Sequence, residues 1–545
     1  MKLIENASKE KLRGGFYTPE AIAKFILKWA VNGNRHYDVL EPSCGDGVFL
    51  EQIKSNKFEY HSVKAIELDP IEAEKAKKIK LLNTKVINSD FYDYFNSTSD
   101  KFDLVIGNPP YIRYQYFDKK QREESEKIFK KAGFKFSRLM NSWVSFVVGS
   151  SLLLKEKGKI GFVLPAEILQ VSYAKQLRTF LARFYNKISI VSFRKLVFDN
   201  IQQEVVLLLC EKNPLEKNHL IEHLEVKDTS DLETLDVYKL KTPQKKIDFK
   251  SNKWTFYFLN QEEINFLEKL INEEKIKPLG HFAKVEVGIT MGSNEFFTVP
   301  SDITNKYNLS EYAKPMVGRS VQVNGNIFTR NDWKNNINSM ARAYFIQFPS
   351  KKEMKSNKEA LKYLQDGENR GIHKGYKTGI RNEWQIVPSA WVSEALFLRR
   401  NNIYPKFVIN EAKAYTTDTM HRVSLRKDRN VLTGKKVILN ALIASYYNSL
   451  SLAFAEISGR SHGGGVLELM PSEVESILIP YKEENEKMIY RIDKMMREEK
   501  PIEEILDITD KIVLKEGYGF TDREIKLARA IWKKLMLRRT NRGKA

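Results

Sequence analysis

The stretch "FDLVIGNPPYIRY", residues 102–114, joins a buried strand to an unusual corner. Its apolar run from Phe102 to Ile106 is typical of a core strand, and the run ends abruptly in Gly-Asn-Pro-Pro-Tyr. The two consecutive prolines donate no backbone hydrogen bond and hold φ at about −65°, so the chain is stiff there. We therefore expect a rigid turn whose carbonyl oxygens point outward, followed directly by an aromatic ring.

Segments on both sides of this strand alternate between helical and extended patterns. Residues 21–30 have the spacing of an amphipathic helix, and Thr18-Pro19-Glu20 precedes them as a helix start. Further strands are expected at 36–42, 62–69, 84–90, 101–108, 158–165 and 187–211, and further helices at 47–54, 70–82 and 139–155. This alternation predicts an α/β fold with a Rossmann-like, doubly wound, mostly parallel sheet. Residues 212–255 are expected to be a charged connector with one or two edge strands.

Composition and charge limit the class of protein. The chain has 545 residues, which predicts two or three domains, and its formal net charge is +21. That charge indicates a polyanionic partner, nucleic acid first, although a generally lysine-rich composition is the alternative. Because the chain lacks a long apolar run and an N-terminal signal core, we expect no membrane association. Two cysteines fit a reducing cytoplasm, and scattered histidines without a CxxC pair predict no metal site.

The segment "VLEPSCGDGVFL", residues 39–50, is predicted to be a strand, a glycine turn and a helix. Gly45 and Gly47 allow a ligand to approach the backbone, and the helix N-terminus favours polar or anionic groups. The spacing matches neither the phosphate-binding loop nor the dinucleotide fingerprint. Glu41 at the strand end is suited instead to a cationic group such as an ammonium. By itself the pattern is equally consistent with a structural turn.

Two further acids follow the next strands. Glu67 ends the strand of "KAIELDP", where nucleotide-binding α/β folds place a carboxylate on the ribose hydroxyls. Asp90 and Phe91 follow the third strand; a carboxylate accepts from an adenine amino group, and a ring stacks on the adenine face. Each of these alone is equally consistent with a solvated acid, a turn residue or a core ring. Together with Glu41 they describe a site for an amine, a ribose and an adenine, which is S-adenosylmethionine or a close relative.

The corner after residue 106 suits chemistry on an exocyclic amine of a nucleobase. Such an amine is a poor nucleophile because its lone pair is delocalised into the ring. The side-chain oxygen of Asn108 and the carbonyl of Pro109 can each accept one N–H bond and so free the lone pair for attack on a methyl sulfonium. Tyr111 can stack on a base that is flipped out of the helix. The alternative is a stiff strand-to-loop turn with a core tyrosine.

Five segments in chain order carry a family resemblance: "GGFYTPEAIAKFI", "VLEPSCGDG", "AIELDP", "NSDFYDY" and "FDLVIGNPPYIR". They resemble the motif series of gamma-class amino-group DNA methyltransferases, in particular the TaqI-like adenine methylases of type II restriction–modification systems. The resemblance covers residues 13–212 and implies a class I methyltransferase fold. It implies contacts to S-adenosylmethionine at Tyr17, Thr18, Glu41, Cys44, Gly45, Gly47, Glu67, Asp90 and Phe91. It implies a catalytic set of Asn108, Pro109, Pro110 and Tyr111. Cys44 is not a cytosine-5 nucleophile, because the Pro-Cys loop of that chemistry is absent.

Two aromatic residues extend the resemblance. Residues 141–165 resemble the helix and strand that follow the family's catalytic loop, and Phe146 falls where a phenylalanine of the family lines the cofactor pocket. Phe198, in 195–212, corresponds to the second aromatic, which makes it the expected partner of Tyr111 around the flipped base. Taken without the resemblance, both are more typical of ordinary core residues.

The second half of the chain is expected to read the DNA sequence. We expect a catalytic domain at 1–245, an α+β target-recognition domain at 246–480 and a basic helical extension at 481–545. Residues 284–299, 379–389, 421–429 and 459–471 resemble parts of the family's recognition domain. Arginine suits bidentate contacts to guanine and lysine suits phosphates. Candidate DNA contacts are Arg381, Arg399, Arg400, Arg422 and Arg460, each of which is also consistent with a solvated surface arginine.

The residues together predict an adenine-N6 methyltransferase that acts on a short specific site in double-stranded DNA. It is expected to be a cytoplasmic monomer that protects DNA from a separate cognate restriction endonuclease. Cytosine-N4 methylation is the nearest alternative, and Asn in place of Ser at position 108 favours adenine. Glutamine-N5 methylation of a protein fits poorly with the large basic second half, and a fused nuclease is not expected. A catalytically dead recognition protein of a phage-defence system remains the alternative from another class.

Overall fold

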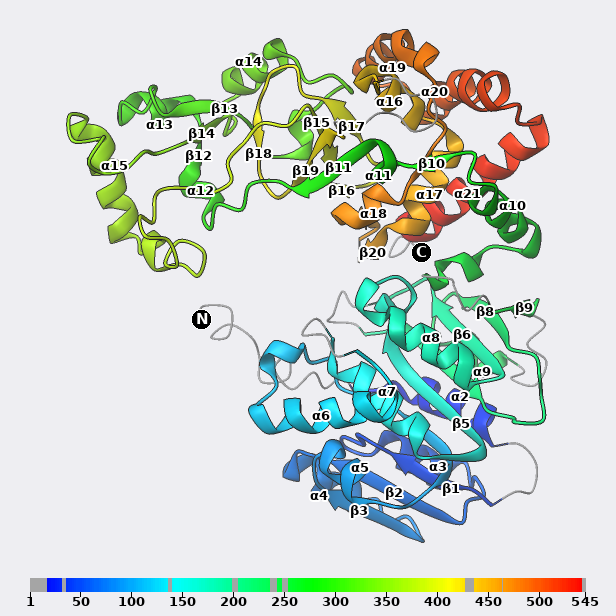
Figure 1. Cartoon of the computed structure of the whole chain (residues 1–545). Coiled ribbons are helices and arrows are strands. Elements are labelled where there is room, and N and C mark those ends of the chain that lie inside the picture. Colours follow the sequence, from blue (N-terminus) through cyan, green and yellow to red (C-terminus); the bar gives the residue numbers. More distant parts are fainter. Residues whose placement is uncertain are drawn as a thin grey trace. The chain divides into compact units, whose positions relative to one another are not determined.

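A computed structural model describes residues 17–31, 36–135, 140–198, 204–235, 243–247, 253–426, 436–462 and 464–541. Some predicted features lie partly outside the described residues: 13–16 of the N-terminal motif, 427–429 and 463 of the recognition segments, and 542–545 of the basic tail. The chain divides into two compact units. Unit 1 extends to Ile264, and unit 2 comprises Asn265–Ser461 and Gly465–Thr540 (Figure 1).

Unit 1 is built on a nine-stranded sheet with the order β3-β2-β1-β4-β5-β7-β6-β8-β9. The strands are β1 (Asp38–Glu41), β2 (Ser62–Glu67), β3 (Thr84–Asn88), β4 (Phe102–Gly107), β5 (Leu154–Pro165), β6 (Lys187–Phe193), β7 (Val205–Glu211), β8 (Leu220–Val226) and β9 (Lys245–Lys246). Strands β1 to β5 pair in parallel, and β7 runs antiparallel to both β5 and β6. The predicted doubly wound, mostly parallel sheet is therefore confirmed. Strands β8 and β9 of the predicted connector extend the sheet at one edge.

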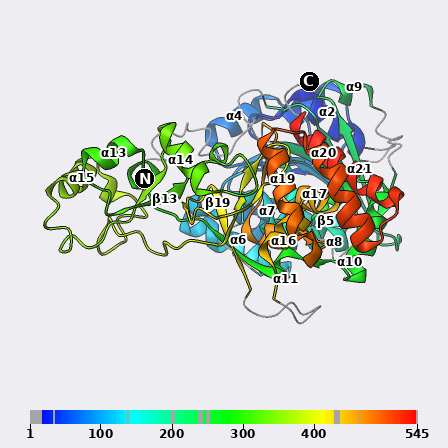
Figure 2. The same ribbon diagram turned by 90° about the horizontal axis from the view of Figure 1, so that it is seen from above.

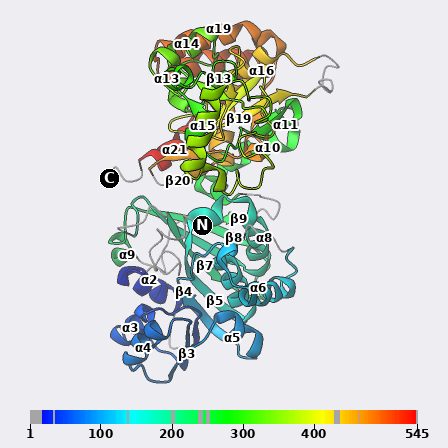
Figure 3. The same cartoon turned by 90° about the vertical axis from the view of Figure 1, so that its left-hand side faces the viewer.

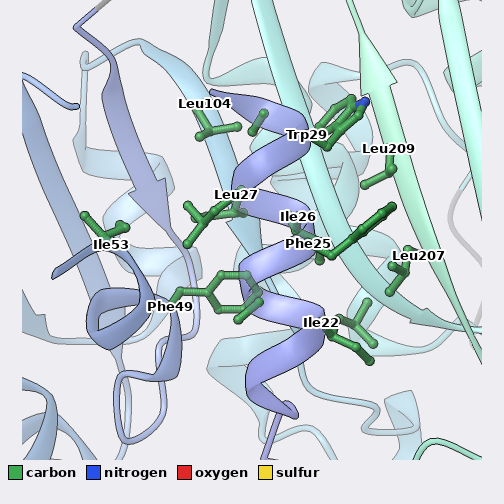
Figure 4. Packing of buried hydrophobic residues seen from close by; sticks show 14 of the residues in the cluster. Ile22, Phe25, Ile26, Leu27, Trp29, Phe49, Ile53, Leu104, Leu207 and Leu209 are labelled. Atoms are coloured by element: carbon green, nitrogen blue, oxygen red, sulfur yellow. The ribbon is translucent and has the colours of Figure 1, made fainter. Parts of the chain in front are cut away.

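Helices cover both faces of this sheet. They are α2 (Glu20–Ala30), α3 (Val48–Ser55), α4 (Pro70–Lys78), α5 (Phe91–Ser97), α6 (Lys119–Lys131), α7 (Ser142–Leu152), α8 (Lys175–Phe184) and α9 (Asp231–Thr234). Figure 3 shows α2 and α3 on one side of the strands and α5, α6 and α8 on the other. Figure 4 shows the buried side chains of α2 packed between α3 and the sheet: Phe25 and its neighbours lie toward Phe49 of α3 and toward Leu207 and Leu209 of β7. Each such buried side chain contributes about 1.5–3 kcal/mol relative to exposure.

Unit 2 combines short strands with helices, as the predicted α+β class requires. Its sheets have the orders β11-β19-β15-β17, β12-β14-β13-β18, β16-β21-β20 and β10-β22. The strands are β10 (Lys277–Pro278), β11 (Ala283–Val287), β12 (Thr298–Val299), β13 (Ala313–Val317), β14 (Tyr344–Ile346), β15 (Ala395–Leu398), β16 (Arg400–Asn401), β17 (Phe407–Ile409), β18 (Tyr415–Thr416), β19 (Met420–Leu425), β20 (Arg460–His462), β21 (Val466–Glu468) and β22 (Leu478–Ile479).

The helices of unit 2 form two groups. They are α10 (Gln261–Glu273), α11 (Leu279–Phe282), α12 (Asn294–Phe297), α13 (Ser301–Lys306), α14 (Arg330–Asn338), α15 (Lys358–Asn369), α16 (Leu439–Tyr446), α17 (Ser449–Ser458), α18 (Pro471–Glu475), α19 (Met488–Arg497), α20 (Ile502–Thr509) and α21 (Asp522–Thr540). Helices α16, α17, α19, α20 and α21 gather at one end of the unit, whereas α13 and α15 lie at the other (Figure 2).

The basic C-terminal segment forms the predicted helix, α21, and this helix packs against α17 within unit 2. A fully buried ion pair between Arg539 and Glu456, with nitrogen and oxygen 2.6 Å apart, joins the two helices. The predicted boundaries between functional domains, at 245 and 480, stay predictions. The division after Ile264 reflects the compactness of the two units and tests neither functional boundary. Among the described residues, no helix has the length and apolar character needed to cross a membrane.

Candidate functional site

A cavity of about 530 Å³ lies in unit 1 at the carboxyl ends of the parallel strands. Strands β1, β2 and β4 end at Glu41, Glu67 and Gly107, and parallel pairing brings these ends to one edge of the sheet. Most of the predicted site residues line this single cavity: Tyr17, Thr18, Glu41, Cys44, Gly45, Glu67, Asp90, Phe91, Asn108, Pro110 and Phe146. The cofactor candidates and the Asn-Pro-Pro corner therefore share one space.

Four predicted residues do not line the cavity: Gly47, Pro109, Tyr111 and Phe198. Gly47 has a packing role, because its φ is +99° and a Cβ atom there would lie 2.4 Å from Cδ1 of Ile79 and 3.2 Å from Cα of Ala76. Glycine at this position lets the start of α3 approach the end of α4.

Glu67 organises the turn after β1. Its two carboxylate oxygens accept hydrogen bonds from the backbone N–H groups of Gly45 and Asp69, both at 2.8 Å. Burial raises the pKa of Glu67, and the two backbone donors oppose that shift. Asp69 in turn caps the N-terminus of α4 by accepting from Ile71. The carboxylate of Glu67 is thus held rigidly at the cavity wall.

Glu41 is the most electrostatically strained group of the cavity. Its side chain is only 2% exposed, and its Oε2 atom has no hydrogen-bond partner among the described residues. Burial, and after it the nearby carboxylates of Glu67 and Asp46, raise the pKa of Glu41 well above its usual range. A buried acid without a partner is costly, and a cation at this position would relieve the cost.

Asp90 starts α5 and faces the same cavity. Its Oδ1 atom accepts from the backbone N–H of Tyr92 at 2.8 Å, and its Oδ2 atom accepts from the Gln121 side chain at 3.0 Å. Burial raises the pKa of Asp90. The neighbouring Phe91 ring stacks on Phe146 of α7, with ring centroids 4.6 Å apart. This part of the wall therefore offers a fixed acceptor beside an aromatic surface.

Two serines hold the Asn-Pro-Pro corner from both sides. The Ser43 hydroxyl donates to the main-chain carbonyl of Asn108 at 3.2 Å, and the Ser142 hydroxyl donates to the carbonyl of Pro110. The carbonyl of Pro109, between them, accepts no hydrogen bond from any described residue. The turn is therefore rigid, as predicted, and leaves one of its three carbonyl oxygens without a partner in that part of the chain.

The orientation of Tyr111 differs from the expectation of an aromatic ring that faces the ligand space. Its hydroxyl lies 2.9 Å from Oδ1 of Asn108 and 3.1 Å from the carbonyl oxygen of Val163, and it donates its one proton between them. The ring packs against the hydrophobic cluster that contains Phe198, which is itself buried. The two predicted aromatic partners thus lie in one cluster, beside the cavity instead of in its wall.

Several cavity residues were not predicted from the sequence. Gln121 of α6 donates a hydrogen bond to Asp90, and Ser142 of α7 donates one to the Asn-Pro-Pro corner. Neither residue belongs to a periodic pattern or a motif in the sequence. Leu68 could have been noticed, because it is an apolar residue directly after the strand-end acid Glu67, and the structure leaves it 59% exposed. Other unpredicted lining residues are Pro42, Ser43, Asp46, Val48, Phe49, Asp69, Pro70, Glu72, Ser89, Tyr92, Ile112, Tyr116 and Phe117.

In unit 2, two of the predicted DNA-contact arginines brace loops. Arg422 is 7% exposed, and its guanidinium donates to the carbonyls of Val287 and Ser389 at 3.1 and 2.9 Å. Arg381 donates to the carbonyl of Met291 at 2.7 Å, and burial lowers the pKa of its guanidinium. These contacts favour a structural role for Arg422 and an anchoring role for Arg381.

The other three arginines pair with glutamates. Arg399 and Arg400 both lie 3.0 Å from Oε1 of Glu468, and Arg460 lies 3.0 Å from Oε1 of Glu473. Among the five predicted arginines only the Arg400 side chain, at 68% exposure, is mostly open to solvent. The DNA contacts of these arginines stay predictions.

The strand order, the antiparallel β7 and the cavity lined by strand-end acids define a Rossmann-like class I methyltransferase. Comparison with known families identifies the type. Residues 21–198 match the Eco57I restriction-modification methylase family, and residues 251–514 match the C-terminal domain of type II methyltransferase M.Eco57I. The chain therefore belongs to the DNA methyltransferases of type II restriction–modification systems.

Individual relatives agree with this assignment. The chain is similar to type II methyltransferase M.AccI of Acinetobacter calcoaceticus, with 25% identity over 479 residues that cover 84% of each chain. It is 29% identical over 204 residues to M.HincII of Haemophilus influenzae, a match confined to 37% of each chain. The fold resembles that of a nuclease-deletion mutant of the Type ISP restriction-modification enzyme LlaGI, with a TM-score of 0.50 and 13% identity. That match covers 88% of this chain and 46% of the other.

Proposed function

We propose that the protein transfers a methyl group from S-adenosylmethionine to the N6 amine of adenine in double-stranded DNA. The single observation that carries the proposal is that three strand-end carboxylates and Asn108 line one cavity. The net charge of +21 supports a DNA substrate, and the relatives are named as type II methyltransferases.

The cavity wall suits each part of the cofactor. S-Adenosylmethionine supplies a methyl group on a sulfonium, together with an ammonium, a ribose and an adenine. The unpartnered Oε2 of Glu41 is suited to the ammonium, since a cation there offsets the burial of the carboxylate. Glu67 has remaining lone pairs for the ribose hydroxyls, and Asp90 has them for the adenine amine. Phe91 presents its ring beside Asp90.

The reaction needs two oxygen acceptors at the target nitrogen. In the proposed mechanism Oδ1 of Asn108 and the carbonyl of Pro109 each accept one N–H bond of the adenine amine. The nitrogen lone pair then attacks the methyl carbon, and the electron pair of the broken C–S bond returns to sulfur. The methylated amine loses one proton to water. Because Ser43 and Ser142 already fix the corner, the acceptors are preorganised for the transition state.

Tyr111 must release Asn108 before the base can bind. Its hydroxyl now donates toward Oδ1 of Asn108, the atom that the adenine amine requires. A rotation of Tyr111 out of the cluster with Phe198 would free that oxygen and present the ring to the flipped base. In this proposal Tyr111 and Phe198 then hold the target base between them, as the family resemblance implies.

The biological role follows from the reaction. A site-specific methyltransferase of this type protects host DNA from a cognate restriction endonuclease, which we place on a separate chain. Cytosine-N4 methylation would use the same acceptors on a different amine, and the product therefore decides between the two.

The test is the identity of the methylated nucleoside. Purified protein is incubated with DNA and isotopically labelled S-adenosylmethionine, and the DNA is hydrolysed and analysed by mass spectrometry. The expected result is label in N6-methyldeoxyadenosine. Label in N4-methyldeoxycytidine, label in protein, or no transfer would contradict the proposal.

A further inference from the structure

A basic loop of unit 2 ends at Arg381, and its other basic residues are not among the predicted DNA contacts. The segment "RGIHKGYKTGIR", residues 370–381, directly follows α15 and contains four Lys and Arg residues without any acid. Tyr376 and Ile380 are 81% and 70% exposed, and Lys374 and Lys377 are exposed as well. The loop thus combines positive charge with apolar side chains that are open to solvent.

This loop is rigidly built despite its exposed tip. The backbone N–H of Gly379 donates to the carbonyl of Gly375 at 2.7 Å and closes a tight turn. A Cβ atom on Gly379 would lie 3.0 Å from that same carbonyl oxygen, so the turn leaves little room for a side chain there. Thr378, which is fully buried, donates through its hydroxyl to the carbonyl of Ile372 at 2.5 Å, and Arg381 anchors the end of the loop on Met291.

A chain of contacts links three other loops to this one. A Cβ atom on Gly292 would lie 3.0 Å from Cβ of Lys377, which places loop 290–294 against loop 374–381. The Asn294 side chain donates to Asp418 at 3.4 Å and connects loop 290–294 to loop 417–419.

The chain of contacts ends at a fourth loop. The hydroxyls of Thr417 and Thr419 donate to the carbonyl of Gly318 at 3.1 and 2.8 Å, and they connect loop 417–419 to loop 318–321. We call these four loops, 290–294, 318–321, 374–381 and 417–419, the four-loop rim.

The most exposed large apolar side chains of unit 2 lie on the four-loop rim. Among the described residues of the unit, the three most exposed large apolar side chains are Tyr376, Val321 and Ile380, at 81%, 77% and 70%. Single exposed apolar residues need no explanation, but two lie on the basic loop 374–381 and the third on loop 318–321, which the chain of contacts links to it. Apolar tips flanked by lysines fit a surface that meets bases and phosphates together.

We propose that the four-loop rim is the surface through which unit 2 contacts duplex DNA. This inference rests on the proposed function and names residues for it. Tyr376 and Ile380 contact the bases, where an aromatic or aliphatic side chain meets base faces or a thymine methyl group. Lys374 and Lys377 contact phosphates on either side, because flexible ammonium groups suit the backbone and carry no sequence information.

Two double variants separate these roles. Lys374→Ala with Lys377→Ala is expected to weaken binding to all duplexes alike and to lower the salt dependence of log K by about two units. Tyr376→Ala with Ile380→Ala is expected to leave the salt dependence unchanged and to reduce methylation of the preferred site relative to other sites by about tenfold or more.

Matched controls come from α19 of the same unit. Tyr490 and Lys494 are also well exposed, and Tyr490→Ala with Lys494→Ala is expected to change DNA affinity and methylation by less than about twofold. All variants are checked for unchanged thermal unfolding and unchanged affinity for S-adenosylmethionine, which unit 1 binds in the proposed function.

The outcomes distinguish this inference from the function on which it rests. If the protein methylates DNA but both loop variants behave like the α19 control, the inference is overturned and the function stands. If no methylation occurs but the lysine variant still lowers the salt dependence of duplex binding, the inference stands and the function fails. If duplex binding is absent from the wild-type protein, both fail.

Discussion

The substitution Glu41→Gln tests whether the negative charge of Glu41 binds the ammonium group of S-adenosylmethionine. The side chain is 2% exposed, Oε2 has no hydrogen-bond partner among the described residues, and burial, followed by neighbouring acids, raises the pKa of the carboxyl. Glutamine keeps the shape and one carbonyl oxygen but removes the charge. We expect the variant to fold and to lose most of its affinity for S-adenosylmethionine.

The magnitude follows from the environment of the carboxylate. A hydrogen bond to a charged group contributes about 1.5–3 kcal/mol, and full burial places this one in the upper half of the range. A loss of about 2–3 kcal/mol corresponds to a dissociation constant that rises by about 30- to 150-fold, since 1.4 kcal/mol is a factor of ten.

The sign of the pH dependence is also fixed. Because the pKa of Glu41 is raised above its ordinary value of 4.5, the ligand-free native state keeps a proton that the unfolded chain has released. The stability of the ligand-free wild type therefore falls as the pH rises from about 4.5 through the raised pKa. Binding of a cation favours the carboxylate, so the affinity for S-adenosylmethionine rises over the same window. Both slopes are expected to flatten in Glu41→Gln.

Isothermal titration calorimetry with S-adenosylmethionine at several pH values measures the affinity and its pH slope, and denaturant unfolding of the ligand-free protein at the same pH values measures the stability slope. The matched control is Glu74→Gln, which changes an exposed carboxylate of α4 that pairs with Lys77 at 2.6 Å and does not line the cavity. We expect less than about a threefold change in affinity for the control, because an exposed pair contributes little. An affinity of Glu41→Gln within about threefold of wild type, with an unchanged pH slope, would refute the assignment of the ammonium to Glu41.

Three further predictions concern other parts of the chain. Tyr111→Phe removes the hydroxyl that covers Asn108 but keeps the ring, so its single-turnover methylation rate should stay within about threefold of wild type. Tyr111→Ala removes the ring as well, and its methylation rate should fall by about tenfold or more in the same assay. DNA affinity of the wild type should fall linearly with log salt concentration in anisotropy titrations, and a flat response would contradict a phosphate-contacting second unit. Arg539→Met leaves Glu456 buried without its partner and should cost about 3–5 kcal/mol in denaturant unfolding; Arg539→Met with Glu456→Met should recover most of this loss.

The sheet and the shared position of the acids could be predicted because both follow from local rules. Alternating strands and helices give a parallel sheet, and a parallel sheet places Glu41 and Glu67 at one edge. The stiffness of the corner also follows from its two prolines. The residues that fix the corner could not be predicted, because Ser43 and Ser142 come from distant segments and a serine has no distinctive pattern.

The orientation of Tyr111 and the roles of the arginines depend on tertiary contacts. The Tyr111 hydroxyl points to the carbonyl of Val163 on strand β5. The spacing of residues in the sequence does not predict a hydrogen bond between such distant positions. Arg422 looks like a DNA contact in a basic sequence, yet in strand β19 it is buried and donates to two backbone carbonyls. Exposure separates Lys374 and Tyr376 from such bracing residues, and only the folded chain gives exposure.

The central claim is that Asn108 and Pro109 supply the oxygens that activate the target amine. The most direct test is the single-turnover methylation rate of Asn108→Ala, measured with saturating DNA and S-adenosylmethionine. We predict a rate lower by about a hundredfold or more, as for loss of a preorganised acceptor, with DNA and cofactor affinities within about threefold of wild type. A rate close to that of the wild type, with both ligands bound, would contradict the account.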